Sequence, residues 1–272
     1  MIISAPRLFR DGAITGPGAV VVGSGVIDAV LDFVPPAAED HVALDHGMLT
    51  PGLIDTHNNG AFGVNCAAAD TEGFTLLCSR LAEHGITAFL PTIITAPIEN
   101  LIEAAGRVRA ARDALSDLPI CQIMGLHLEG PFLAPEKRGV HREGWLRQPD
   151  NDSLDKLLTG ELLVVLRMVT LAPELPGAIM AIRRLAAMGV AVSIGHSKAD
   201  AKTAQAAVDA GASLATHVFN AMRPFNHRDP GIIGVALSDR RLFACFIADG
   251  VHADPVALRA GFAAAGTRAV AV

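Results

Sequence analysis

The chain has 272 residues, of which 51% are hydrophobic and 18% are charged, and its formal net charge is −6 with histidine neutral. This composition excludes intrinsic disorder, which requires low hydrophobicity and high net charge. The acidic balance argues against a nucleic acid or an anionic membrane as partner. The sequence contains neither a run of roughly 20 apolar residues nor a signal-peptide pattern at its start. We therefore expect a soluble, cytoplasmic protein with four reduced cysteines.

Residues 1–50 differ in pattern from the rest of the chain. They contain short β-like pieces, at 1–4, 19–22 and 26–31, separated by turns rich in Gly and Pro. From residue 51 onward, continuous apolar runs alternate with amphipathic helical stretches. The apolar runs are 53–57, 87–92, 120–129, 162–170, 190–196, 213–219, 243–249 and 268–272. The helical stretches are 71–84, 99–114, 176–188, 198–210 and 255–264.

Apolar strands that alternate with helices predict a parallel sheet covered by helices. Eight such runs favour a closed (β/α)8 barrel over residues 51–272, whose eighth strand is 268–272. An open doubly wound sheet is the alternative, but it would carry a Gly-rich phosphate loop after its first strand, and none is present. Residues 130–152 lack periodicity and are too long for an ordinary connection, so we expect them to be functional.

The chemistry of the chain is concentrated where the predicted strands end. In a (β/α)8 barrel, polar residues at the carboxyl ends of strands face the reaction site. Histidines occur there in five runs, at His57, His127, His196, His217 and His252. One such histidine would be a hydrogen-bonded core residue, but several joined by a carboxylate point to a metal. Glu129, His196 and His217 supply the imidazoles and the carboxylate that a catalytic transition metal prefers, with one position open for water.

Four segments carry a resemblance to a known family: 51–60 (PGLIDTHNNG), 127–132 (HLEGPF), 195–197 (GHS) and 216–222 (THVFNAM). Together they resemble the N-acetylglucosamine-6-phosphate deacetylases of the amidohydrolase superfamily, over essentially the whole chain. The resemblance implies a barrel with a small β-sandwich built from both chain ends. It implies hydrolysis of N-acetyl-D-glucosamine 6-phosphate to D-glucosamine 6-phosphate and acetate, a step of amino-sugar catabolism and cell-wall recycling.

The resemblance also implies metal-site roles. Glu129, His196 and His217 match the ligands of one divalent ion, zinc first, with iron, manganese or cobalt as alternatives. His141, in the long loop after the third strand, matches a histidine that stabilises the oxyanion. Many relatives carry His-x-His after the first strand and bind two metals. This chain has His57-Asn58-Asn59 there, so we expect a second site of His57 and Asn59 that is weak or empty.

Substrate contacts follow from the same comparison. His252 matches a histidine that contacts the sugar, and Asn220 and Ala221 match the loop that holds the phosphate. Arg228 matches an arginine that reaches the phosphate of the neighbouring subunit's site, which implies a homodimer or a dimer of dimers. An arginine fork suits a phosphate dianion better than lysine does.

Amidohydrolases place a catalytic aspartate directly after the eighth strand, and this sequence stops at Val272. We therefore expect these residues to lack the general base and the C-terminal strands of the sandwich, and to be inactive by themselves.

Two rival functions stay open. A dihydroorotase-like or D-aminoacylase-like amidohydrolase would show His-x-His and a carboxylated lysine on the fourth strand, but residues 162–171 contain no lysine. A non-enzymatic barrel with a structural metal, or an inactive fragment that binds a ligand, is the second rival. Structural zinc sites are usually closed and rich in cysteine, and no cysteine lies near a ligand motif here.

Overall fold

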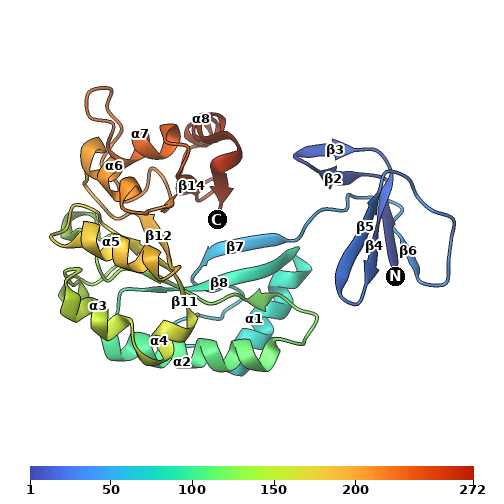
Figure 1. Ribbon diagram of the computed structural model, residues 1–272, viewed down its shortest axis with the longest axis horizontal. Helices are drawn as coiled ribbons and strands as arrows, with labels where there is room; N and C mark the ends of the chain where they lie inside the picture. The colour runs from blue at the N-terminus through green and yellow to red at the C-terminus, as the bar shows by residue number, and fades with distance from the viewer. The chain divides into compact units, whose positions relative to one another are not determined.

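A computed structural model describes residues 1–272 of the protein. The chain divides into two compact units, Met1–Leu53 and Ile54–Val272 (Figure 1). The first unit contains only strands, and the second contains all the helices together with the large parallel sheet.

The first unit contains a four-stranded mixed sheet and a separate two-stranded ribbon. The sheet runs β5-β4-β1-β6, from β5 (Val26–Leu31), β4 (Gly18–Gly23), β1 (Ile2–Ala5) and β6 (His41–Ala43). β4 is antiparallel to both neighbours, and β6 is parallel to β1. β2 (Leu8–Arg10) and β3 (Ala13–Thr15) form the ribbon. The three predicted β pieces are confirmed. Ser24 and Gly25, both with positive φ, join β4 to β5 in the two-residue hairpin turn that suits a twisted sheet.

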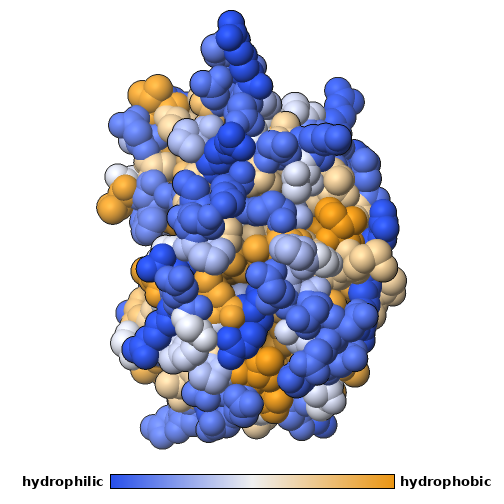
Figure 2. Space-filling view, turned by 90° about the vertical axis from the view of Figure 1, so that its left-hand side faces the viewer, coloured by the Kyte–Doolittle hydropathy of each residue, from blue (hydrophilic) through white to orange (hydrophobic).

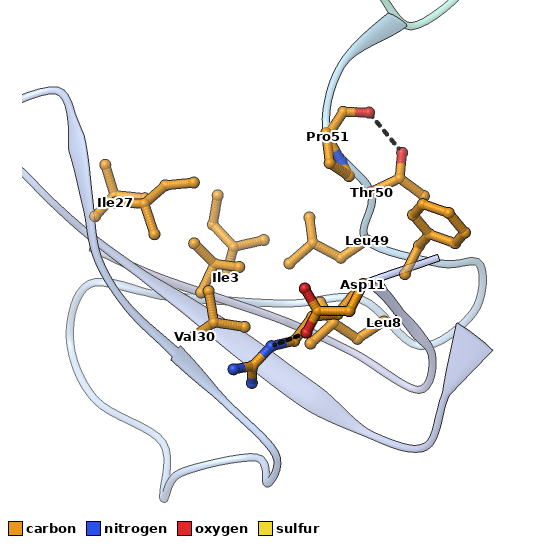
Figure 3. Close-up of a pocket in the computed structure, with 12 residues that line it drawn as sticks. Ile3, Leu8, Asp11, Ile27, Val30, Leu49, Thr50 and Pro51 are labelled. Atoms are coloured by element: carbon orange, nitrogen blue, oxygen red, sulfur yellow. Dashed lines mark hydrogen bonds and ion pairs between the residues drawn. The ribbon is translucent and has the colours of Figure 1, made fainter. Parts of the chain in front are cut away.

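A cavity of about 480 Å³ lies in this first unit (Figure 3). Its lining is mainly apolar side chains, including Ile3, Leu8, Ile27 and Val30. The charged groups in the lining, Arg10 and Asp11, form an ion pair of 3.3 Å. The cavity contains no histidine and none of the residues predicted for metal or substrate, so the candidate site is elsewhere.

The second unit holds eight strands in one sheet, in chain order, as the sequence predicts. They are β7 (Leu53–Asn58), β8 (Ile86–Ile94), β10 (Leu126–Glu129), β11 (Leu166–Leu171), β12 (Ala191–Ile194), β13 (Leu214–Ala215), β14 (Phe243–Phe246) and β15 (Ala269–Ala271). The strands from β8 to β15 pair in parallel, and the short β9 (Gln122–Ile123) adds to β8. The sheet curls as a barrel does, but β7 and β15 are its two edges and do not pair (Figure 1). The predicted closed barrel is therefore a curled sheet in this chain, open between β7 and β15.

Helices cover the sheet. The five predicted ones are α1 (Thr71–Glu83), α2 (Ile98–Leu115), α5 (Ala178–Ala187), α6 (Ala201–Asp209) and α8 (Pro255–Ala265). Four helices begin with an aspartate whose carboxylate accepts a backbone N–H of the first turn, at Asp70, Asp150, Asp200 and Asp254. α1 contacts β8, α5 contacts β12, and α8 contacts β14 and β15. Short 3-10 turns occur at Pro135–Lys137, Glu143–Trp145 and Gly266–Arg268.

Three helices were not predicted: α3 (Asn151–Leu157), α4 (Gly160–Val165) and α7 (Gly231–Ser238). α4 corrects the predicted fourth strand, which begins only at Leu166. Leu162 and Val165 are three residues apart and therefore share one face of a helix. Both are fully buried, and α4 packs on α2. Tertiary packing thus decides the conformation of an apolar run that is too short to show its own period.

On the side of α3, α5 and α6, hydrophilic side chains predominate and apolar ones form only small patches (Figure 2). Small apolar patches of this kind are normal on a protein surface. None of the helices combines the length and the apolar character that crossing a bilayer would require.

Candidate metal centre

The carboxyl ends of the barrel strands bring five titratable side chains together. His57 lies on β7 and Glu129 ends β10, while His196 and His217 each come two residues after the last residue of β12 and β13. The fifth, His141, comes from the long loop after β10. Four of these side chains are buried, and His57 retains 11% exposure. The loop without periodicity is therefore part of the site.

Glu129 is the centre of this cluster. Its Oε1 lies 3.1 Å from Nε2 of His196 and 3.1 Å from Nε2 of His217, and these two nitrogens are 3.0 Å apart. Its Oε2 lies 3.5 Å from Nε2 of His57 and 3.6 Å from Nε2 of His141. One carboxylate therefore faces four imidazoles, and the three residues predicted as ligands form a compact triangle.

Backbone contacts determine which nitrogen of His196 faces the site. Nδ1 of His196 lies 2.8 Å from the backbone carbonyl oxygen of Lys137. A carbonyl oxygen only accepts, so Nδ1 carries the proton, and Nε2 of the neutral ring presents a lone pair to Glu129. Histidines that bind metals commonly donate their other N–H to a backbone carbonyl in this way.

His141 has the opposite arrangement. The backbone N–H of Thr95 donates to Nδ1 of His141 over 3.2 Å, and the Thr95 hydroxyl lies 2.9 Å from the same atom. The proton of a neutral His141 ring therefore sits on Nε2, which is buried and has no hydrogen-bond partner. By distance alone, the ligand atoms of Glu129, His141 and His196 form a set within 4.8 Å. The hydrogen bonds distinguish the two histidines, because His141 turns an N–H donor toward Glu129 and His196 turns a lone pair toward it.

Burial and mutual contact shift the protonation of the cluster. Burial would raise the pKa of Glu129, but its close contacts with the rings of His141, His196, His217 and His57 outweigh burial and hold that pKa well below its usual value. Burial lowers the pKa of His217. An ionised carboxylate beside neutral imidazoles is the donor set that divalent transition metals prefer.

An ion fits between Glu129, His196 and His217. His196 Nε2 has no proton to donate, so its contact with the carboxylate places electron pairs against one another. A cation at their centre would satisfy all three atoms. Nδ1 of His217, on the other side of its ring, is buried and unpaired.

The backbone around His196 and His217 is strained. Both have left-handed φ, of 47° and 34°, and such positions cost about 1–3 kcal/mol each for residues other than glycine. Glu174 stabilises the turn after His196, because its carboxylate accepts from the Ser197 hydroxyl at 2.6 Å and from the Lys198 N–H at 2.7 Å. Strained backbone held by neighbours is frequent at functional sites.

Asn220 and Ala221, predicted to hold phosphate, lie in the loop after β13. Nδ2 of Asn220 is buried without a partner, so it is a donor available to a ligand. Ala221 has a φ of 49°, and its carbonyl accepts from the Ser197 N–H at 3.1 Å. This bond ties the loop to the turn that follows His196.

Arg228 and His252 are exposed and lie outside the buried cluster. No ion pair holds the Arg228 guanidinium. Nδ1 of His252 lies 2.7 Å from Oδ2 of Asp249. The backbone N–H groups of His252 and Val251 lower the pKa of Asp249 to about 2, together with the His252 ring. Asn59 Nδ2 donates to the Thr92 carbonyl at 3.1 Å, which fixes the orientation of the amide.

Sequence reasoning assigned no role to two residues beside the cluster. Thr95, just past β8, sets the tautomer of His141 through its backbone N–H. His127 lies on β10 two residues before Glu129, so both side chains project from the same face of the strand. His127 is fully buried, and burial, with the neighbouring His57, lowers its pKa to about 3. The two-residue spacing between His127 and Glu129 was the one signal in the sequence that could have placed the His127 side chain on the same face of the strand as Glu129.

The chain matches the amidohydrolase family over residues 48–266. It is 40% identical to the N-acetylglucosamine-6-phosphate deacetylase of Bos taurus, an alignment that covers 93% of this chain and 64% of that protein. It is 35% identical to the enzyme of the same name from Bacillus subtilis, covering 98% of this chain and 68% of that one.

Among solved structures, the chain resembles a mutant N-acetyl-D-glucosamine-6-phosphate deacetylase from Mycobacterium smegmatis in complex with N-acetyl-D-glucosamine-6-phosphate. The TM-score is 0.91 at 34% identity, and the match covers 100% of this chain and 70% of that one. The chain therefore spans roughly two thirds of the length of these relatives.

Proposed function

The chain belongs to the amidohydrolase family, in the group of the N-acetylglucosamine-6-phosphate deacetylases, and from this membership we propose that its protein hydrolyses the acetamide of N-acetyl-D-glucosamine 6-phosphate. The products are D-glucosamine 6-phosphate and acetate. The observation that carries the proposal is the Glu129 carboxylate, which lies 3.1 Å from each of the two imidazole nitrogens of His196 and His217.

Glu129, His196 and His217 would hold one divalent ion, and zinc suits this donor set best. When bound, such an ion polarises the amide carbonyl and lowers the pKa of a water molecule. A second ion would need His57 and Asn59. Asn59 offers only a neutral amide oxygen, which is not among the usual ligands of zinc, and this supports a second site that is weak or empty.

His141 supplies the donor for the reaction. Its Nε2–H is buried, unpaired and 3.6 Å from Glu129 Oε2. When water attacks the acetyl carbon, negative charge develops on the carbonyl oxygen, and a preorganised donor in a dry site stabilises that charge. Thr95 fixes this donor in advance, because its backbone N–H occupies the other ring nitrogen.

Phosphate recognition would use the loop after β13. Asn220 offers its unpaired Nδ2, and Arg228 has no carboxylate partner of its own, so both can serve an anion. Arg228 would act on the neighbouring subunit's substrate in a homodimer. His252, held by Asp249 through Nδ1, would present Nε2 to a sugar hydroxyl.

The test measures acetate release by a chain extended to the full length of the relatives, loaded with zinc. N-acetylglucosamine 6-phosphate should react far faster than unphosphorylated N-acetylglucosamine, because binding energy from the remote phosphate orients the amide. N-acetylgalactosamine 6-phosphate, the C4 epimer, tests tolerance at the sugar. Equal kcat/KM for the phosphorylated and unphosphorylated sugars would exclude a phosphosugar deacetylase and favour another amidohydrolase activity.

A further inference from the structure

His57 reaches the candidate site from an edge strand. β7 pairs with β8 on one side only, so backbone pairing holds its carboxyl end less firmly than the ends of the central strands. The His57 ring must nevertheless lie close to Glu129, with its Nε2 3.5 Å from Oε2. Side-chain contacts from β8 and β10 hold the residues on either side of His57.

Two buried residues provide these contacts. Nδ1 of His127 lies 3.0 Å from the carbonyl oxygen of Thr56, the residue before His57. Thr92 Oγ1 accepts the backbone N–H of Asn58, the residue after His57, at 3.1 Å. The His127 ring also packs edge-on against the His57 ring, with centroids 4.9 Å apart and planes at 77°.

A row of buried hydroxyls determines which way His127 donates. Because Thr56 offers a carbonyl oxygen, His127 Nδ1 carries the proton, and Nε2 accepts from Thr170 Oγ1 at 2.8 Å. Thr170 Oγ1 lies 2.7 Å from Thr216 Oγ1, which lies 2.5 Å from Ser193 Oγ. Each hydroxyl in the row then donates toward His127, and such a chain of hydrogen bonds strengthens each of its members.

We propose that His127 is a positioning residue: its Nδ1–H bond to the Thr56 carbonyl holds the end of β7 so that His57 stands against Glu129. His127 itself touches neither the ion nor the substrate, since both of its ring nitrogens are occupied by protein atoms. The inference rests on the metal site proposed above and adds buried residues that hold its side chains in position.

Two substitutions separate the two ring nitrogens of His127. In His127→Asn the amide occupies the place of Nδ1 and can still donate to Thr56. In His127→Gln the amide reaches the place of Nε2, so the bond to Thr170 is kept and the bond to Thr56 is lost. The zinc affinity of a chain extended to the full length of the relatives is measured for both by competition with a chelator, and thermal unfolding without metal checks that each variant folds.

His127→Gln should weaken zinc binding about 10- to 100-fold, the usual cost of losing a residue that orients a ligand. His127→Asn should bind close to the wild type. In a His57→Ala background, His127→Gln should add no further loss, because the effect acts through His57. Equal losses in the two His127 variants, or a full additional loss in the His57→Ala background, would overturn the proposal.

Backbone amide exchange over residues 54–60, measured without metal, gives a second readout. The exchange should be faster in His127→Gln than in the wild type and unchanged in His127→Asn. If the wild-type chain binds no zinc, the proposed metal site is wrong, but this exchange still decides the role of His127. If His127→Gln does not fold, Thr92→Val replaces it. That variant removes the acceptor of the Asn58 N–H and keeps nearly the same side-chain shape. Unchanged exchange over residues 54–60 in Thr92→Val would refute the positioning role proposed for His127 and Thr92.

Discussion

The rings of His141 and His196 lie 4.6 Å apart between centroids, with their planes at 72°, and they present opposite atoms to the same carboxylate. His196 donates a hydrogen bond from Nδ1 to the Lys137 carbonyl and turns a lone pair toward Glu129. His141 instead accepts at Nδ1 from the Thr95 N–H and turns an N–H toward the carboxylate. Backbone groups on two loops therefore turn an acceptor nitrogen of one ring and a donor N–H of the other toward Glu129.

Replacing Glu129 with glutamine should abolish tight zinc binding. The amide keeps the size of the side chain but removes the charge that faces His196 and His217. The loss should exceed the roughly 10- to 100-fold effect of residues that only support ligands, measured by chelator competition. Glu136→Gln is the matched control, because Glu136 is exposed and pairs with Lys198. A Glu129→Gln chain with wild-type affinity would exclude Glu129 as a ligand.

The two tautomers predict a clean split between His141 and His196. His141→Asn keeps an amide beside Thr95 but removes the donor from the site. It should lower kcat about 10²- to 10³-fold and leave zinc affinity unchanged. His196→Asn should instead lose zinc. Both are measured on the full-length zinc-loaded enzyme, by acetate release and by metal content. Loss of zinc in His141→Asn would make His141 a ligand and reverse the assignment.

Asn220→Ala should raise KM for N-acetylglucosamine 6-phosphate roughly 10- to 100-fold, the range of a hydrogen bond to a charged group. The variant should change kcat/KM little for the unphosphorylated sugar. The reason is the buried, unpaired Nδ2 of Asn220, which has no partner within the protein. Steady-state kinetics with both sugars measure the split. Equal losses for the two sugars would place Asn220 in the fold and not at the phosphate.

The four cysteines predict a loss of stability at alkaline pH. Burial raises the pKa of Cys66, Cys78, Cys121 and Cys245 to about 12, against about 8.5 for a free thiol. Above pH 8.5 the unfolded chain releases thiol protons that the folded chain keeps. The free energy of unfolding should therefore fall as pH rises toward 12, by up to about 1.4 kcal/mol per pH unit for each thiol.

Urea unfolding at several pH values measures this slope, and Cys245→Ala should reduce it by the share of one thiol. At pH 8 a thiol reagent should label the native chain slowly, because reactivity requires an exposed thiolate. In denaturant the same reagent should label all four cysteines quickly. Rapid labelling of the native chain would show that the thiols are not buried as described.

The sequence by itself predicted the alternation of strands and helices, the eight parallel strands and the gathering of Glu129, His196 and His217. These features depend on local periodicity and on one topological rule, that parallel strands end on the same side of a barrel. The residue types at the strand ends were therefore enough to expect a metal, before any distance was known.

Only the tertiary structure decided which atoms face the site. The tautomers of His141 and His196 depend on Thr95 and Lys137, which are distant from them in the chain. The helical start of the predicted fourth strand depends on packing against α2. The role proposed for His127 depends on hydroxyls from other strands. A hydrogen bond is defined by direction and distance, and no periodic pattern in the sequence carries that information between residues far apart in the chain.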